Sequence, residues 1–305
     1  MNDMPTTAAN DAGNGTDKRR QILAIACILA AGTFWGCIGI FNRGLSAIGI
    51  APMTIVLLRN LGACIILAIF FLCRDRSIFR IRLRHLPIFL CSGLISILCF
   101  TICYFYSQQV SSLAVAAILL YTAPAFVVIF SALIWKEKIT KRKLSALIIA
   151  FLGCCFVAGI LNGSLAISRQ GLIVGIGSGL FYSSYTIFGR FALKHYQPFT
   201  VTFYTFLIAA IGSLFLVDYG DVASTLHDGH AVLLALGLML FATVFPYILY
   251  TKGLSDLGDS GKASILASIE PVVAAIVGIL AFGEPMTVGV ALGLLCILTS
   301  VYILR

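Results

Sequence analysis

The sequence contains few charged residues. Asp, Glu, Lys and Arg make up only 11% of its 305 residues, and 60% are hydrophobic, whereas soluble domains carry about 25% charged residues. A chain so poor in charge cannot cover a water-exposed surface with polar side chains. The composition therefore excludes an ordinary soluble domain and favours a protein whose main solvent is lipid.

The chain also lacks the patterns of an enzyme, a metal site or a disulfide framework. No HExxH motif occurs, no Ser/His/Asp set converges in the apolar runs, and the ten cysteines include no CxxC pair. The four histidines lie in or beside loops without metal-ligand spacing: His85, His195, His227 and His230. We therefore expect that the protein is not an enzyme and binds no cofactor, except for a coupling proton.

A nucleotide site is excluded as well. The stretch DLGDSGKA at 256–263 is similar to a phosphate-binding P-loop, but Asp256 stands where that motif requires Gly, and Ala263 where it requires Ser or Thr. We therefore expect that any transport is not driven by ATP.

Long apolar runs are the main feature that is present. Each of ten runs is about 20 residues long, enough to cross a bilayer as a helix. They lie near 22–41, 52–72, 86–106, 113–135, 144–161, 171–191, 199–217, 230–250, 262–283 and 286–304. The expected fold is an all-α polytopic membrane protein with ten transmembrane helices, preceded by a disordered cytoplasmic tail at 1–20.

The distribution of Lys and Arg predicts the orientation. If the N-terminus is cytoplasmic, all but three of the 21 Lys and Arg residues fall on the cytoplasmic side; Arg43 and Arg169 lie outside, and Arg59 lies within a helix. This agrees with the positive-inside rule and places both termini in the cytoplasm. The net charge of +9 is thus explained by topology, and we expect no nucleic-acid partner.

The chain contains an internal repeat with an offset of 147 residues. GTFWGCIGIFNR at 32–43 aligns with GLFYSSYTIFGR at 179–190. In the fourth and ninth runs, Ala116, Ile118, Leu119, Pro124, Ile129, Leu133, Glu137, Thr140 and Leu147 recur as Ala263, Ile265, Leu266, Pro271, Ile276, Leu280, Glu284, Thr287 and Leu294. The predicted repeats are 21–161 and 162–305. Each holds five spans, an odd number, so the two insert with opposite orientation, as in many secondary transporters.

These features resemble those of a known group of proteins. Ten spans, cytoplasmic termini, the Trp35-Gly36 pair and the pattern that links Pro124 to Glu137 and Pro271 to Glu284 are similar to EamA-type members of the drug/metabolite transporter superfamily. The resemblance covers about 22–304. It implies a small-molecule carrier of a cytoplasmic membrane in a bacterium, exporting amino acids or related metabolites; other branches carry sugars, nucleotide sugars or drugs.

Two ionisable residues lie well inside the spans. Glu270 falls near the bilayer midplane, where it would exchange a proton or hold a substrate ammonium; the structural alternative is a hydrogen-bonded Glu, or one neutralised by Arg59. Arg59 carries a permanent charge that suits a carboxylate or phosphate, with snorkelling or a structural ion pair as the alternative.

Prolines and aromatic residues complete the predicted site. Pro124, Pro246 and Pro271 each remove a backbone donor inside a span, which predicts a helix break or a bend. Five aromatic residues lie near mid-span, where they would line a cavity or, alternatively, pack against other helices or lipid: Trp35, Tyr104, Tyr121, Tyr182 and Tyr247. Small-residue stripes, such as Gly32 with Gly36, predict close helix contacts.

The sequence favours a secondary transporter of small polar metabolites that works by alternating access. Two alternatives stay open: a carrier of anionic or phosphorylated metabolites that uses Arg59, and a non-transporting membrane receptor or scaffold. The expected partners are a small-molecule substrate and the bilayer, with monomer and homodimer both open.

Overall fold

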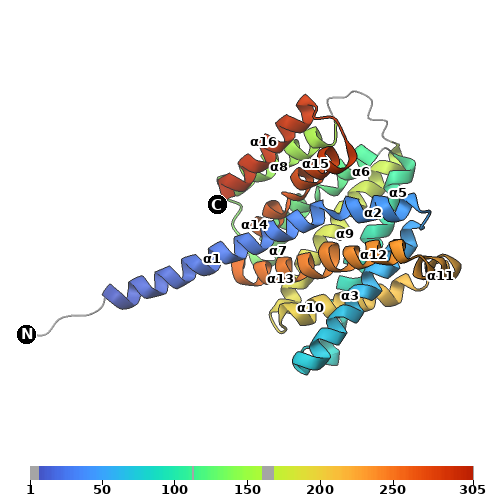
Figure 1. Cartoon of the computed structure of the whole chain (residues 1–305). Helices are drawn as coiled ribbons and strands as arrows, with labels where there is room; N and C mark the ends of the chain where they lie inside the picture. Colours follow the sequence, from blue (N-terminus) through green and yellow to red (C-terminus); the bar gives the residue numbers. More distant parts are fainter. Residues whose placement is uncertain (1–6, 112, 160–167, 305) are drawn as a thin grey trace, which may run out of the picture.

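The computed structural model describes residues 7–111, 113–159 and 168–304, which form helices joined by short turns and loops (Figure 1). The α-helices are α1 (Thr7–Gly36), α2 (Ile38–Ala47), α3 (Pro52–Arg74), α4 (Leu86–Leu90), α5 (Phe100–Val110), α6 (Leu113–Leu120), α7 (Ala123–Trp135), α8 (Lys141–Val157), α9 (Arg169–Leu193), α10 (Pro198–Ser213), α11 (Tyr219–His227), α12 (Gly229–Met239), α13 (Phe245–Leu257), α14 (Ser260–Ala267), α15 (Glu270–Phe282) and α16 (Val288–Leu304). No strand occurs within the described ranges.

Seven helical segments are long and apolar enough to cross a membrane. They are Lys18–Ala47, Pro52–Arg74, Leu83–Val110, Ala114–Trp135, Arg169–Leu193, Gly229–Leu257 and Ser260–Phe282, and the apolar helices α10 and α16 are shorter. The all-helical fold predicted from the sequence is therefore confirmed, and seven of the ten predicted spans lie in helices of sufficient length. α1 begins at Thr7, within the stretch for which the sequence predicts a tail.

Several of the long segments are interrupted near their middle. α6 ends at Leu120 and α7 begins at Ala123, and the ninth predicted span divides in the same way between α14 and α15. Pro124 and Pro271 occupy the second position of α7 and α15, where a missing backbone donor costs no helical hydrogen bond. The two prolines that the repeat aligns therefore begin new half-helices.

Pro246 has a different effect. It lies at the second position of α13, directly after the π-helical segment η5 (Leu240–Val244), and the helix continues from α12 through η5 into α13. A π-helical turn absorbs the missing hydrogen bond by re-pairing the backbone. A second π-helical segment, η3 (Cys91–Cys99), lies in the corresponding span of the first half. At Pro246 the helix is thus continuous, with a π-helical segment directly before α13.

Helices from the two halves pack against one another. α1 contacts α13, α14 and α15, and α9 contacts α5, α6 and α7. α3 packs on α10, and α8 packs on α16. In Figure 1 the start of α1 and the C-terminal end of α16 lie on the same side of the bundle, and α11 lies on the opposite side.

Glycines allow α1 and α9 to approach the broken helices closely. A Cβ atom added to Gly32 would lie 2.5 Å from the Ile269 side chain and 2.9 Å from the Ala267 carbonyl oxygen. A Cβ atom added to Gly179 would collide with the Thr122 side chain and lie 3.2 Å from the carbonyl oxygen of Leu120. The two contacts involve equivalent positions of the repeat: Gly32 and Gly179, Ile269 and Thr122, and Ala267 and Leu120 each lie 147 positions apart. In the first contact the glycine comes from the first half, and in the second contact it comes from the second half.

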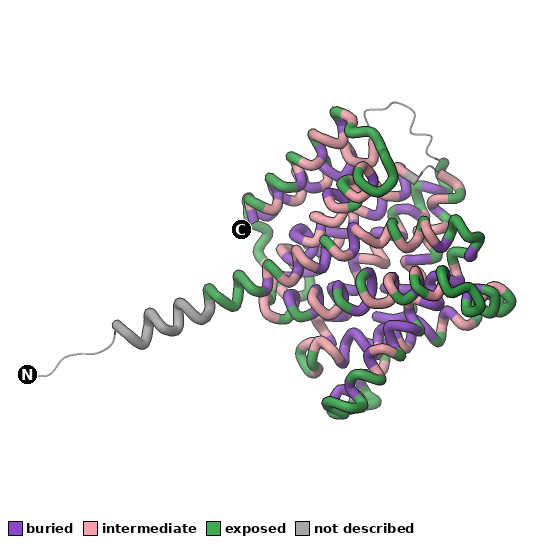
Figure 2. Tube along the Cα trace, in the orientation of Figure 1, coloured by how far each residue is buried: buried purple, intermediate pink, exposed green. Residues whose placement is uncertain are grey.

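Apolar side chains also cover much of the surface. Ile69, Phe70, Leu133, Leu280 and Leu295 are all more than half exposed, and the exposed and intermediate residues form the outer face of the bundle (Figure 2). Apolar surface of this extent is unfavourable in water and is the expected boundary with lipid chains.

A pair of glycine variants in α9 tests the close contact. In Gly179→Ala the added methyl group meets backbone oxygens that cannot move away, so we expect a loss of about 1–3 kcal/mol of stability. A Cβ atom added to Gly177 would have no neighbour within 4 Å among the described residues, so Gly177→Ala should unfold at or above the wild-type temperature. Thermal unfolding in detergent measures both, and equal melting temperatures for the two variants would contradict the contact.

Candidate functional site

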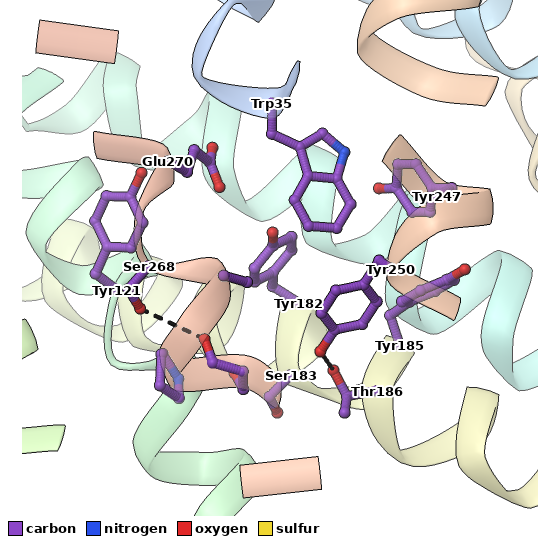
Figure 3. Close-up of a pocket in the computed structure, with 13 residues that line it drawn as sticks. Trp35, Tyr121, Tyr182, Ser183, Tyr185, Thr186, Tyr247, Tyr250, Ser268 and Glu270 are labelled. Atoms are coloured by element: carbon purple, nitrogen blue, oxygen red, sulfur yellow. Dashed lines mark hydrogen bonds between the residues drawn. The ribbon is translucent and has the colours of Figure 1, made fainter. Parts of the chain in front are cut away.

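A cavity lies among the broken helices, between residues of both halves (Figure 3). Its empty volume is ≈ 480 Å³, which includes space open to solvent. The lining residues are Trp35, Tyr121, Pro124, Tyr182, Ser183, Tyr185, Thr186, Tyr247, Tyr250, Ser264, Ala267, Ser268 and Glu270. A concave lining of aromatic rings with a few polar groups is typical of a small-molecule site.

Aromatic rings from three helices form one wall of the cavity. Trp35 of α1 lies with its ring centroid 5.1 Å from that of Tyr247 and 5.4 Å from that of Tyr250, both on α13. Tyr185 of α9 contacts Tyr247 edge to face at 5.0 Å. Trp35 is only 6% exposed, so its position is fixed by packing. This wall offers ring faces to a ligand and can hold a cation by cation–π attraction.

Two threonines, one on α9 and one on α13, each hold a tyrosine of the other helix in place. The hydroxyls of Tyr250 and Thr186 lie 2.7 Å apart, and those of Tyr185 and Thr251 lie 2.8 Å apart. Because a buried hydroxyl without a partner costs about 1–3 kcal/mol, these pairs hold the two rings against α9 and α13. Tyr121, Tyr182 and Tyr247 make no such side-chain hydrogen bond among the described residues, so their hydroxyls remain available to a ligand.

Glu270 is the acidic residue of the cavity lining. It is the first residue of α15, directly before Pro271, where unpaired backbone N–H groups and the helix dipole favour negative charge. Figure 3 shows its carboxyl group near the Tyr121 hydroxyl and the Trp35 ring. Within the described part of the chain the carboxyl group has no side-chain hydrogen bond. It is therefore free to accept a proton or to bind a cationic group.

Arg59 of α3 does not belong to the cavity lining. Its Nε and Nη2 atoms are buried and have no hydrogen-bond partner among the described residues. Arg59 interacts electrostatically with the hydroxyls of Tyr182 and Tyr247, as Glu270 does. No ion pair joins Arg59 to Glu270 within the described ranges, so the two side chains do not neutralise each other through a direct contact.

The structure brings most of the predicted site residues together. Glu270, Trp35, Tyr121, Tyr182, Tyr247 and Pro124 all line the cavity. Four predicted residues lie outside the lining: Arg59, Tyr104, Pro246 and Pro271. Tyr104 of α5 is hydrogen-bonded to Gln108 and stacks on Phe100, whose ring in turn contacts that of Tyr182 at 5.0 Å.

Several residues of the cavity lining were not predicted from the sequence. Tyr185 and Thr186 follow Tyr182 by three and four positions, and Tyr250 follows Tyr247 by three. Residues with this spacing share one face of a helix, so the positions already chosen indicated their neighbours. Ser264 and Ser268 gave no comparable signal. Among the described residues no group of three or more His, Cys, Asp or Glu side chains is placed to hold a metal ion.

Comparison with known proteins identifies the family. The model of the EamA-like transporter family matches twice, at residues 22–159 and 169–305. The chain belongs to the EamA-like transporter family. The two matches cover nearly all of the membrane-crossing segments, which makes the protein a multi-pass membrane protein of a transporter family.

Several relatives of this EamA-family chain are known by sequence. Two uncharacterized transporters of Archaeoglobus fulgidus are 32% identical over 66% of this chain and 70% of the relative, and 29% identical over 89% and 94%. The uncharacterized inner membrane transporter YicL of Salmonella typhimurium is 26% identical over 91% and 93%. A solved crystal structure has the same fold, with a TM-score of 0.78 over 92% of this chain and 95% of that one at 16% identity.

The Thr186–Tyr250 pair can be tested by a double-mutant cycle. Thr186→Val leaves a buried tyrosine hydroxyl without its partner, so we expect a loss of about 1–3 kcal/mol of stability, whereas Tyr250→Phe in the same background should recover part of it. Thr186→Ser keeps the hydroxyl and serves as the control. Thermal unfolding measures all variants, and purely additive losses in the double variant would contradict the pairing.

Proposed function

We propose that this EamA-family protein is a secondary active transporter of small polar metabolites. Amino acids or related compounds are the leading substrates, moving outward across the cytoplasmic membrane by alternating access. The observation that carries the proposal is the cavity between the two halves, with aromatic rings on one wall and the Glu270 carboxyl group without a hydrogen bond among the described side chains. A carboxylate kept at mid-membrane is costly and marks a functional site.

The proposal includes an inverted repeat of ten spans. It is supported by the double match of the family model and by the exchanged contacts of Gly32 and Gly179 with the broken helices. Two halves related in this way can form two packings of similar energy, one open to each side, around a fixed central site. The cavity fits that geometry because Trp35, Tyr121 and Pro124 come from the first half and the other lining residues from the second.

Glu270 has two chemical roles in this proposal. In its charged form it pairs with the ammonium group of a substrate, while Trp35 and the tyrosines surround the rest of the molecule. In its protonated form it releases the substrate, so that proton and substrate alternate at one carboxyl group. Such competition for one group would link outward substrate movement to inward proton movement.

Arg59 supports a second candidate function. Its buried Nε and Nη2 atoms lack a partner among the described residues, and an unpaired guanidinium edge fits a carboxylate or phosphate in a two-pronged contact. The alternative substrate is therefore an anionic or phosphorylated metabolite that reaches Arg59 through Tyr182 and Tyr247. Arg59→Lys would then weaken the uptake of anionic substrates more than that of neutral ones.

Transport by purified protein in proteoliposomes tests the leading proposal. Radiolabelled amino acids, organic amines and organic phosphates are offered across a pH gradient. We expect Glu270→Gln to lower uptake of the transported compound about tenfold or more, since a charged hydrogen bond is lost, and to abolish the dependence on pH. Glu270→Asp keeps the charge and should retain part of the activity.

A binding readout separates loss of binding from loss of movement. Trp135→Phe leaves Trp35 as the single remaining tryptophan, and its fluorescence should change when a substrate enters the cavity. Full and still pH-dependent uptake by Glu270→Gln would contradict the role of the carboxyl group. Absence of uptake for all three compound classes by the wild-type protein would contradict the proposed substrates.

A further inference from the structure

An ion pair beside an aromatic ring joins the middle of α2 to the C-terminal end of α15. Arg43 Nη2 lies 2.6 Å from Glu284 Oε1, and the Arg43 guanidinium carbon lies 4.4 Å from the centre of the Phe282 ring. We call these three residues the Arg43 latch. It links the first span of the first half to the ninth span, which belongs to the second half.

The same arrangement occurs a second time. Arg190 Nη1 is paired with Glu137 Oε1, and the Arg190 guanidinium carbon lies 4.3 Å from the centre of the Trp135 ring. We call these residues the Arg190 latch. Each of its members lies 147 positions from the corresponding member of the Arg43 latch, with cation and anion exchanged between the halves.

The two latches lie at opposite ends of the helix bundle. The Arg43 latch joins α2 to the end of α15, and the Arg190 latch joins the end of α9 to the end of α7 and the start of α14. In Figure 1 α2 and the start of α14 lie on opposite sides of the bundle. The central cavity lies between them, lined by residues of α1, α9, α13–α15 and the α6–α7 break. Each latch therefore ties a helix of one half to a helix of the other at its own end of the bundle.

The latches differ in burial. The side chains of Arg43 and Glu284 are 56% and 44% exposed, whereas those of Arg190 and Glu137 are 21% and 12% exposed. A solvent-exposed ion pair contributes little and is weakened further by salt. Breaking a buried pair is much less favourable, because each charge loses its partner in a poorly solvated environment.

Additional hydrogen bonds reinforce only the Arg190 latch among the described residues. Lys143 Nζ lies 3.4 Å from Glu137 and 2.8 Å from Asp259, and Arg190 donates to Ser260 Oγ at 2.8 Å. The backbone N–H of Ser260 donates to Glu137 at 3.1 Å. In the other latch the position of Lys143 is taken by Val290, which carries no charge.

Asp259 remains ionised within this network. Burial raises the pKa of Asp259, but hydrogen bonds from Lys143 and from the backbone N–H of Lys262 outweigh that effect and leave the pKa below its ordinary value. At neutral pH the carboxylate is therefore charged and holds Lys143 in place.

We propose that the two latches are the two gates of alternating access, and that their unequal strength determines which end opens in the absence of substrate. The inference rests on the transport function proposed above. The Arg43 latch separates readily and leaves the cavity open at that end, while the Arg190 latch stays closed until substrate or a proton changes the packing of the halves.

Electron paramagnetic resonance distance measurements on the full-length protein in lipid nanodiscs test this proposal. Spin labels are attached in a background without the ten native cysteines. One labelled pair, at Ala47 and Met286, spans the Arg43 end. The other, at Lys194 and Ile139, spans the Arg190 end at the positions that the repeat makes equivalent. All four residues are exposed.

The two pairs should behave differently without any substrate. We expect the Arg190 pair to show one short distance, and the Arg43 pair to show a second, longer one that grows in Glu284→Gln. In Glu137→Gln a longer distance should become the major population at the Arg190 end, with shortening at the Arg43 end. Asp228→Asn and Asp75→Asn, acids in no ion pair of the described residues, are controls that should change neither pair.

High salt provides a measurement that needs no latch variant. Raised ionic strength should lengthen the Arg43 pair of the wild-type protein and leave the Arg190 pair unchanged. Unchanged distances in both glutamine variants, or a larger opening at the Arg190 end in salt, would overturn the proposal. If the distances respond as expected but no compound is transported, the proposed transport function is wrong and the proposed role of the latches is retained. If a compound is transported but the distances do not respond, the role of the latches is wrong and the transport function is retained.

Discussion

The structure depends on how backbone groups are covered where a helix is interrupted inside the membrane. Lipid supplies no hydrogen bonds, so an irregular turn between half-helices is stable only when protein surrounds it. The breaks between α6 and α7 and between α14 and α15 meet this condition because Gly179 and Gly32 allow α9 and α1 to approach their carbonyl groups closely. These contacts fix the position of each broken helix against a helix of the other half.

The cavity follows from the same breaks. α15 begins at Glu270 because Pro271 prevents the helix from continuing, and the new helix N-terminus is a favourable place for a carboxyl group. Trp35, on the helix that packs against this break, then lies opposite Tyr247 and Tyr250. Glu270, the acidic residue that is costly to place in the membrane, is thus positioned by the helix break before α15.

Periodicity and repetition predicted those parts of the molecule that depend on local chemistry. Apolar run length located the helices, and the offset of 147 residues identified Pro124 and Pro271 as equivalent, which agrees with their positions in α7 and α15. Pro246 was harder to interpret because its effect depends on the π-helical segment before it. Arg59 lies outside the cavity lining because the rotation of α3 is fixed by packing against α10 and α12, which the sequence of α3 alone does not encode.

The ion pairs at the two ends of the bundle were not predicted from the sequence. Arg43, Arg190, Glu137 and Glu284 were all recognised as repeated positions, yet their pairing across the halves became visible only in three dimensions. An inverted repeat exchanges partners, so a residue repeated in both halves contacts the counterpart of its neighbour. The aligned positions could therefore have predicted that each Arg contacts the Glu of the other half.

The central claim is that one cavity between the two halves opens to each side of the membrane in turn. Its most direct test uses Ser268→Cys, a cavity position that is 4% exposed, in the protein without native cysteines, together with a thiol reagent that does not cross membranes. The account predicts that, with the transported compound present, this cysteine reacts from outside in right-side-out vesicles and from inside in inverted vesicles, while the cysteine-free protein reacts in neither. Reaction from one side only, or from neither side, would contradict it.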